Sequence, residues 1–565
     1  MAARRILAFA VTWLVALAVI RVAVAPPEHC APVSRADAHI AATEAVGWFS
    51  RNHRPDGRFI YQYDAEAGSV DPGYQVTRHA GVAMSLYEAH AAGIARALPT
   101  ADRATTWSLE RLERRRGWAA LTDQGAGELR TGSTALTVAG LAVRRLATGD
   151  GRHDDVMAEL GRFLVAMTEP SGAVLEAYDL RADRPVPGRY SYFFTGEAFW
   201  ALALLDRTNP GGEWAEPTQR VAHYLTMRDR VEDLFPPVSD HWAARGLAEL
   251  DRPLAVEHQR YVRRLAGIFG LEVRVESQRQ GRGVNRLLRP AHASGSGLGT
   301  LGEGLGSLGL ITRGGRGFDP DVAGRIDERL RCTASLLVHR QVGADEAAGS
   351  AQPDRVRGAW LDDGVTRMDD QQHALSALLL AEPVLQASSG QGGPSGDDDL
   401  GRVLWLAVIG IAALNPVRTR RGARRIPPSG VALAGGGLLA AAVLASPVLR
   451  AIDVSPPTAL VAAGAVVIVS AVVDLARRSS PDPAMLDALR PAVVLLVVAA
   501  AADGGRSVGM IVALAVTAAA TTGSGTGRLF STTPGRTQNG GWRVAVAAVA
   551  VLGGLDLIAD GVFGI

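Results

Sequence analysis

Pro55-Asp56-Gly57-Arg58-Phe59 is the first of three similar turns, each combining a glycine with a nearby aromatic or apolar residue. The other two are Pro170-Ser171-Gly172-Ala173-Val174 and Val356-Arg357-Gly358-Ala359-Trp360. Each turn is followed by a helical segment rich in alanine and leucine. The first two turns also run on to a tyrosine closely followed by an aspartate, at Tyr63-Asp64 and Tyr178-Asp179. A unit that recurs in this way indicates a repeat architecture.

The helical segments can be aligned at one position in six repeats. The aligned residues are His79, Thr134, Glu197, His241, Glu303 and His373. They are separated by 55, 63, 44, 62 and 70 residues, and each interval accommodates two helices with their loops. Small residues beside the aligned position, such as Ala80 and Ala198, allow close helix packing. The sequence therefore predicts an all-α domain over residues 35–385, a closed (α/α)6 toroid whose outer helices surround a ring of inner helices.

The pattern resembles the toroid shared by terpenoid cyclases, protein prenyltransferases and many polysaccharide-processing enzymes. The turns are similar to degenerate Gln-x-x-x-Gly-x-Trp repeats of triterpene cyclases, with His53 or Asp354 in place of the glutamine. The acidic Asp-x-Asp-Asp motif of the cyclases is absent, and Arg367-Met368-Asp369-Asp370 is among the nearest strings. The resemblance thus implies the fold and not cyclase activity, and the inner helices look closer to glycan-processing toroids.

The N-terminus has the features of an export signal. Arg4 and Arg5 precede an apolar run over residues 6–20, and the small residues Ala23-Val24-Ala25 follow. Because Pro26 disfavours cleavage after Ala25, residues 1–25 are predicted to be either a cleaved signal peptide or an uncleaved signal anchor. In both cases the chain from Pro26 onward is delivered outside the cytoplasm.

The C-terminal part is predicted to lie in the membrane. A Gly/Ser/Asp-rich linker over residues 386–400 leads to long apolar stretches over 401–565, which indicate about six spans. The loop over residues 418–425 holds five arginines and should be cytoplasmic. The sequence therefore predicts a multi-pass protein of the cell membrane with the lipid bilayer as a partner and the toroid domain extracytoplasmic.

The membrane region distantly resembles small six-span transporters of the LysE/MarC type. The resemblance rests on the breaks at Asn415-Pro416 and Asp503-Gly504-Gly505. It implies two halves of opposite orientation, as in transporters built from inverted repeats.

Charge and cysteine content narrow the function classes further. A net charge of +2 predicts no nucleic-acid partner. The two cysteines, Cys30 and Cys332, either form one disulfide that ties the end of the soluble domain to its start or are unrelated thiols. Neither belongs to a CxxC motif, which argues against a cysteine-based zinc or redox site.

The starts of the inner helices of a toroid converge at one mouth, so the six aligned residues should surround one cavity. Polar groups at the head of apolar helices need a reason, because burial without a partner costs about 1–3 kcal/mol per group. The structural alternative to a functional cavity is helix capping, with Asp240 as one of the N-cap residues. The residues expected beside the aligned ones are Arg78, Asp240, Asp369, Asp370 and Gln372.

Two chemistries suit such a cavity. Glu197, Asp240 and His241 are the predicted catalytic residues, acting as acid and base on a glycosidic bond. The predicted substrate-binding residues are Arg78, His79, Tyr192, Trp242, Glu303, Asp369, Asp370, Gln372 and His373. The alternative is a metal bound by His79, His241 and His373, although the preferred interpretation includes no metal and no cofactor. The glycine-rich stretch over residues 294–309 lacks a P-loop lysine, which argues against nucleotide binding.

Three functions remain open. The first is an envelope enzyme, a hydrolase, lyase or epimerase, that binds or processes a polyhydroxylated substrate such as a cell-envelope glycan. The second is a transporter with an extracytoplasmic binding domain, and the third is a non-catalytic envelope interaction protein.

Overall fold

The computed structural model describes residues 28, 30–122, 127–227, 240–250, 254–279, 295–314 and 317–387, together with residue 463. All the helices and strands within these ranges belong to one compact unit, residues 29–279 and 290–391.

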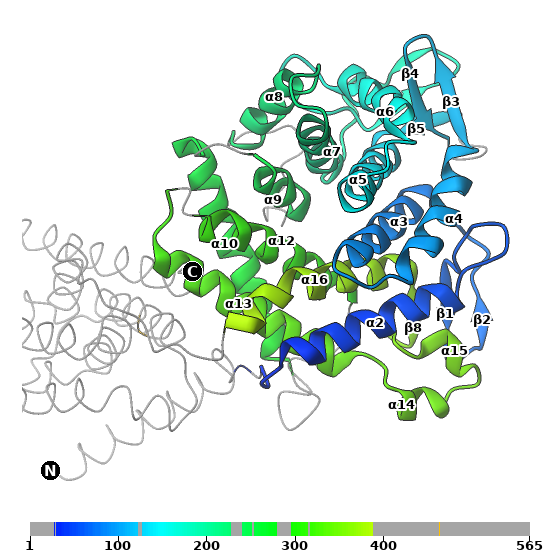
Figure 1. Ribbon diagram of the computed structural model, residues 1–565, viewed down its shortest axis with the longest axis vertical. Helices are drawn as coiled ribbons and strands as arrows, with labels where there is room; N and C mark the ends of the chain where they lie inside the picture. The colour runs from blue at the N-terminus through cyan, green and yellow to red at the C-terminus, as the bar shows by residue number, and fades with distance from the viewer. Residues whose placement is uncertain are drawn as a thin grey trace, which may run out of the picture. The chain divides into compact units, whose positions relative to one another are not determined.

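Six helices form an inner ring in the described part of the chain. They are α3 (Val76–Ala91), α5 (Thr131–Thr148), α7 (Phe194–Thr208), α9 (His241–Ala248), α12 (Gly295–Arg313) and α16 (Met368–Ala387). Each packs against the next, and α16 packs against α3, so the ring closes on itself (Figure 1). All six aligned residues of the sequence repeat fall on these six helices.

A second set of helices surrounds the ring. It consists of α2 (Arg35–Arg51), α4 (Ala97–Leu109), α6 (Asp154–Met167), α8 (Ala215–Leu225), α10 (Val256–Ser277) and α13 (Pro320–Arg340). In the chain, one of these outer helices precedes each inner one, which gives six hairpins over the described ranges. The predicted helical toroid is confirmed, with the apolar core filling the space between the two layers.

The three glycine turns of the sequence repeat are equivalent in space. Gly57, Gly172 and Gly358 have φ of 92°, 97° and 77°, a region that favours glycine. Each lies against an outer helix: a Cβ on Gly172 would stand 2.5 Å from the carbonyl oxygen of Arg220 in α8, and one on Gly358 would stand 2.6 Å from that of Glu44 in α2. The glycines recur because the backbone of each turn packs against an outer helix and leaves no room for a side chain.

Short strands precede several inner helices, so the domain is helical but not purely α. The strands are β1 (Gln62–Asp64), β2 (Ser69–Val70), β3 (Leu112–Arg115), β4 (Trp118–Leu121), β5 (Glu128–Arg130), β6 (Ala177–Asp179), β7 (Arg184–Pro185) and β8 (Val365–Arg367). They form two three-stranded sheets, in the orders β2-β1-β8 and β5-β6-β7, and the hairpin β3-β4. Strands of two to four residues are too short for an alternating pattern to be visible in the sequence. Two short helices, α14 (Ala344–Ala348) and α15 (Pro353–Val356), lie between α13 and β8.

Two links join the first repeat to the last. Strand β1 pairs antiparallel with β8, with Tyr63 opposite Thr366. Cys30 and Cys332 form a disulfide whose Cα atoms are 5.0 Å apart. Near the disulfide, the Ser335 hydroxyl of α13 donates a hydrogen bond to the carbonyl oxygen of Ala31 at 2.6 Å. The disulfide that the sequence left open is therefore present, and it ties the start of the domain to its last outer helix.

Within the described ranges, no helix combines the length and the apolar character needed to span a bilayer. The predicted signal segment at residues 1–25 lies outside the described residues. So does the predicted membrane domain over 401–565, apart from residue 463. Helix α16 continues to Ala387, two residues into the segment predicted as a linker.

Candidate active site

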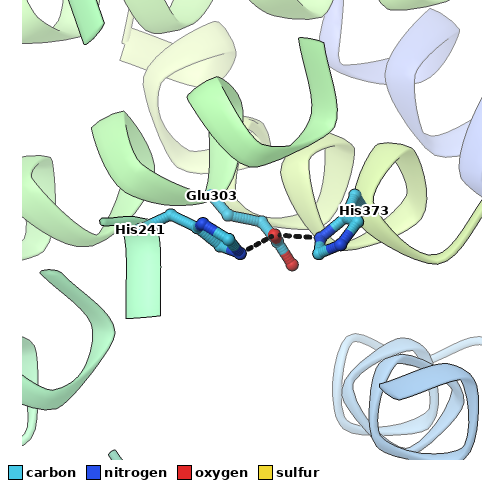
Figure 2. A group of neighbouring side chains, drawn as sticks. All are labelled: His241, Glu303 and His373. Carbon is cyan, nitrogen blue, oxygen red and sulfur yellow. Dashed lines mark hydrogen bonds and ion pairs between the residues drawn. The ribbon is translucent and has the colours of Figure 1, made fainter. Parts of the chain in front are cut away.

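Three side chains from three inner helices meet at one carboxylate oxygen (Figure 2). Nδ1 of His373 in α16 lies 2.6 Å from Oε2 of Glu303 in α12. Nε2 of His241, the first residue of α9, lies 3.5 Å from the same oxygen. The two imidazole rings stand edge to face with their centres 5.2 Å apart. Glu303 thus lies between two imidazoles that come from opposite neighbours in the ring.

Glycines of α12 bring this group together. A Cβ on Gly299 would stand 2.4 Å from the carbonyl carbon of His373, and one on Gly302 would stand 2.5 Å from Cβ of Ala377. The backbone of α12 therefore packs directly against α16 at these glycines, with no side chain between them. The glycine-rich stretch is a helix adapted for close packing, and the packing places Glu303 beside His373.

The second oxygen of Glu303 is held separately. Oε1 accepts a hydrogen bond from Nη2 of Arg245 at 2.8 Å and one from Nε2 of Gln372 at 3.3 Å. Arg245 also forms an ion pair with Glu88 of α3. The Ser376 hydroxyl of α16 donates to Oε2 of Glu88 at 2.6 Å. A buried polar network therefore connects four inner helices through Glu303.

The charges of this network shift the titration of its members. Burial alone would raise the pKa of Glu303, but the positive charges of His373 and Arg245 and the hydrogen bond from His373 hold it at about 2. Burial alone would lower the pKa of His373, but the charge and hydrogen bond of Glu303 raise it above the ordinary value of a histidine. Each member of the pair therefore favours the charged form of the other, a carboxylate beside an imidazolium.

Aromatic side chains lie around the network. Two of them, Trp200 and Trp242, are buried, and two others, Tyr192 and Phe193, are exposed. The ring of Trp242 stacks on Trp200 with centres 5.5 Å apart, and the guanidinium carbon of Arg245 lies 4.5 Å from the centre of the Trp200 ring. Phe193 is 40% exposed, and its ring centre is 6.2 Å from that of His241. The predicted binding residue Tyr192 precedes it in the chain and is 39% exposed.

A second polar cluster lies where α3 and α16 begin. Nε of Arg78 is 3.0 Å from Oδ2 of Asp369, and Arg78 also donates to the hydroxyl of Tyr61. Arg367 pairs with Asp369 at 2.8 Å and with Asp370 at 3.0 Å. The negative charges of Asp369 and Asp370 contribute to the raised pKa of His373, so this cluster adjoins the three-residue group.

His79 does not join the site, contrary to the prediction. It is fully buried between α3 and α4, with its ring centre 4.4 Å from that of Trp107. Its Nε2 is 2.9 Å from the carbonyl oxygen of Ala104, and its Nδ1 is 2.6 Å from the hydroxyl of Tyr74. Since a carbonyl can only accept, Nε2 carries the proton and Nδ1 accepts from Tyr74. Burial lowers the pKa of His79 to about 4, so its role here is that of a neutral core histidine.

The aligned residue of the second repeat also faces outward. Thr134 accepts a hydrogen bond from the backbone N–H of Leu121 in β4 at 3.2 Å. Successive residues of a helix are rotated by about 100° around its axis, so an alignment that is one residue out of step selects another face. His79 and Thr134 are both fourth residues of their helices, whereas His241 is the first and Glu303 the ninth of theirs.

The predicted carboxylate pair is only partly supported. Asp240 is the N-cap of α9 and accepts a hydrogen bond from the backbone N–H of Ala243 at 2.9 Å, which is the capping alternative. Glu197 is buried, and its Oε2 has no hydrogen-bond partner among the described residues. Burial, reinforced by the charge of Asp240, raises the pKa of Glu197 to about 8. Glu197 is therefore a neutral carboxylic acid at pH 7.

The predicted metal set of three histidines is not formed, because His79 lies elsewhere. With Glu303 as the third member, the ligand atoms of His241, Glu303 and His373 lie within 4.8 Å of one another. Proteins also use two imidazoles and a carboxylate to bind zinc. The composition of the group therefore leaves zinc binding as an alternative to proton transfer.

Arg245 and Glu88 were not predicted from the sequence. The available signal was a charged residue inside an otherwise apolar helix, four positions after His241 in one case and near the end of α3 in the other. Such a residue needs a partner, but this partner could not be identified from the sequence, because 157 residues separate Arg245 from Glu88.

No protein-family model matches the sequence, and no curated protein matches it. Among solved structures, the cellobiose 2-epimerase of Spirochaeta thermophila is 14% identical with a TM-score of 0.44, over 60% of this chain and 93% of that one. A D-mannose isomerase is 13% identical with a TM-score of 0.42, over 62% and 96% of the two chains. A GH76 alpha-mannanase of Bacteroides thetaiotaomicron is 6% identical with a TM-score of 0.43, over 62% and 97%. At TM-scores below 0.5 these likenesses carry no argument about activity, which must come from the side chains.

Proposed function

We propose that the helical ring is the catalytic part of an enzyme that transfers protons on a polyhydroxylated carbonyl substrate, the class to which reducing sugars belong. The observation that carries the proposal is the single oxygen of Glu303 that faces both His241 and His373. Imidazole is the side chain best suited to give and take protons near neutral pH. Two imidazoles oriented by one carboxylate provide a donor and an acceptor within one site.

The reaction we infer is redox-neutral. A base removes the proton from the carbon next to the carbonyl while the carbonyl oxygen takes up a proton, which gives an enediol. An acid then returns a proton to carbon while one enediol hydroxyl loses its proton and becomes the carbonyl. Return to the neighbouring carbon interconverts an aldose and a ketose, and return to the opposite face of the same carbon inverts it. His373, paired as an imidazolium with Glu303, is the expected proton donor. His241 is the expected acceptor.

The surroundings of the group favour a sugar over an apolar carbonyl compound. Phe193 offers an exposed aromatic face beside His241, and such faces stack on sugar rings. Arg78, Asp369 and Gln372 supply donors and acceptors for hydroxyl groups. A polyhydroxylated ligand would add hydrogen bonds to these groups, whereas an apolar one would take water away from them and give no hydrogen bond in return.

The test is conversion of reducing sugars by the purified full-length protein, followed by NMR. We expect at least one aldose, ketose or reducing disaccharide to be isomerised or epimerised. His373→Gln and His241→Gln should each lower kcat by about a hundredfold or more, as expected for loss of a general acid or base. His39→Gln, a histidine of α2 paired with Glu382, is the control and should leave kcat unchanged. Loss of activity on chelation with recovery on adding zinc would instead support the metal alternative.

A second candidate is glycoside hydrolysis with Glu197 as the acid and Asp240 as the base. It is favoured by the raised pKa of Glu197 beside Asp240, an arrangement typical of a general acid. The variant Glu197→Gln separates the two candidates. It should abolish release of new reducing ends if Glu197 is the acid, and it should leave sugar isomerisation intact if the histidines do the chemistry.

We infer that the ring acts on the outer side of the cell membrane, with an envelope glycan as the source of its substrate. The Cys30–Cys332 disulfide supports this location, because disulfides persist in oxidising compartments. A cysteine probe introduced near Gly57, at the exposed Asp56, should be labelled in intact cells, and one introduced near Gly422 should not. If no reducing sugar is converted, the transporter-linked and non-catalytic alternatives take precedence.

A further inference from the structure

A continuous chain of buried and partly buried charged groups lies behind the two imidazoles. It runs from Glu88 of α3 through Arg245 of α9 and Glu303 of α12 to His373 of α16. The chain has two negative and two positive members, so its charges balance. Arg245 and Glu88 neither donate nor accept a proton in the proposed reaction. In the chain of charges, Glu88 is the terminal member and Arg245 links it to Glu303.

The geometry of Arg245 is strongly constrained. Its side chain is only 4% exposed, and its guanidinium lies over the face of Trp200. One arm of the guanidinium donates to Glu88, and Nη2 also donates to Oε1 of Glu303 at 2.8 Å. Glu88 is anchored in turn by the hydroxyl of Ser376. Because Oε1 of Glu303 is fixed by Arg245, the other oxygen is directed toward both histidines.

We propose that Arg245, anchored by Glu88, is a positioning residue that holds Glu303 in the orientation in which one carboxylate oxygen serves both imidazoles. Its catalytic effect rests on the proposed function, but its effect on the histidines does not. If Glu303 were released from Arg245, its carboxylate could rotate away, and His373 would lose the partner that favours its charged form.

Other charged groups near His373 are accounted for. Glu303 comes from α12, His241 and Arg245 come from α9, and Asp369 and Asp370 come from α16 itself. Arg78 of α3 is paired with Asp369. Glu382, at the far end of α16, is paired with Arg35 and His39 of α2.

The test combines NMR titration of labelled histidines in the full-length protein with kinetics. In Arg245→Met the titration midpoint of His373 should fall toward the ordinary value of about 6.5, since the contact with Glu303 is lost. Arg245→Lys should lower the midpoint by less than Arg245→Met, because the ammonium can still pair with Glu303. It should still lower the midpoint, because one ammonium cannot hold two carboxylates as a planar guanidinium does. Both variants should reduce kcat about tenfold or more, with a smaller change in KM.

Arg144→Met is the matched control. Arg144 is equally buried and pairs with Asp102 and Asp150, away from the three-residue group. It should lower stability while leaving the midpoint of His373 and kcat unchanged. A His373 midpoint that stays constant or rises in Arg245→Met and Arg245→Lys would overturn the proposal. Removing a nearby positive charge raises the midpoint of a histidine, so such a result would mean that Glu303 keeps its orientation without Arg245. The titration needs no substrate, so it remains informative even if no sugar is converted.

Discussion

At the scale of single residues, the fold decides which acidic groups ionise. Glu303 and Glu197 are both buried glutamates of inner helices, yet their pKa values are about 2 and about 8. The difference arises from their neighbours, because Glu303 faces Arg245 and His373 whereas Glu197 faces Asp240. A sequence shows that a glutamate lies within an apolar helix, but it does not show which charge will stand opposite.

Glu197→Gln should stabilise the protein in a pH-dependent way. The folded-state pKa of Glu197 is raised above the ordinary value, so stability is lost as the pH rises from about 4.5 to about 8. The amide cannot ionise, so the variant avoids this loss. We expect no gain at pH 4 and a gain of more than about 1 kcal/mol in unfolding free energy at pH 8, measured by denaturant titration. Equal stability of the two proteins at pH 8 would show that Glu197 ionises freely.

At the scale of elements, the contact between α12 and α16 depends on glycine. Gly302→Ala would place a Cβ 2.5 Å from Cβ of Ala377, and relief requires the helices to move apart. We expect a loss of about 1–3 kcal/mol in unfolding free energy and lower activity, because Glu303 is the next residue. The control is Gly324→Ala on α13, where an added Cβ meets nothing within 4 Å. That substitution should stabilise the protein by about 0.5–1 kcal/mol. Equal effects of the two would contradict the close-packing explanation.

The predictability of the elements follows from the same physics. The six inner helices were predictable because small and apolar residues recur in them at helical spacing. Three of them, α3, α7 and α16, also follow turns whose glycines are sterically required. The direction in which each side chain points was not, because a shift of one residue rotates it by about 100°. His79 illustrates this limit, since it lies on the predicted helix but packs against Trp107 and Tyr74 outside the ring.

At the scale of the whole molecule, closure of the ring depends on contacts between distant parts of the chain. The Cys30–Cys332 disulfide spans 302 residues, and a cross-link of this span contributes on the order of 5 kcal/mol in the chain-entropy model. Reduction should therefore lower the thermal unfolding temperature by several degrees. The same reductant should have no further effect on Cys30→Ser. If wild type and Cys30→Ser respond equally to reductant, the disulfide does not stabilise the ring.

The central claim is that one oxygen of Glu303 makes two imidazoles into a single proton-transfer site. The most direct measurement is the rate at which deuterium from D2O enters a reducing sugar at the carbon next to its carbonyl. Wild-type protein should incorporate deuterium, and Glu303→Gln should slow incorporation by about a hundredfold while retaining its helical circular dichroism. If wild-type protein exchanges no proton of any reducing sugar, or if Glu303→Gln exchanges at the wild-type rate, the claim is wrong.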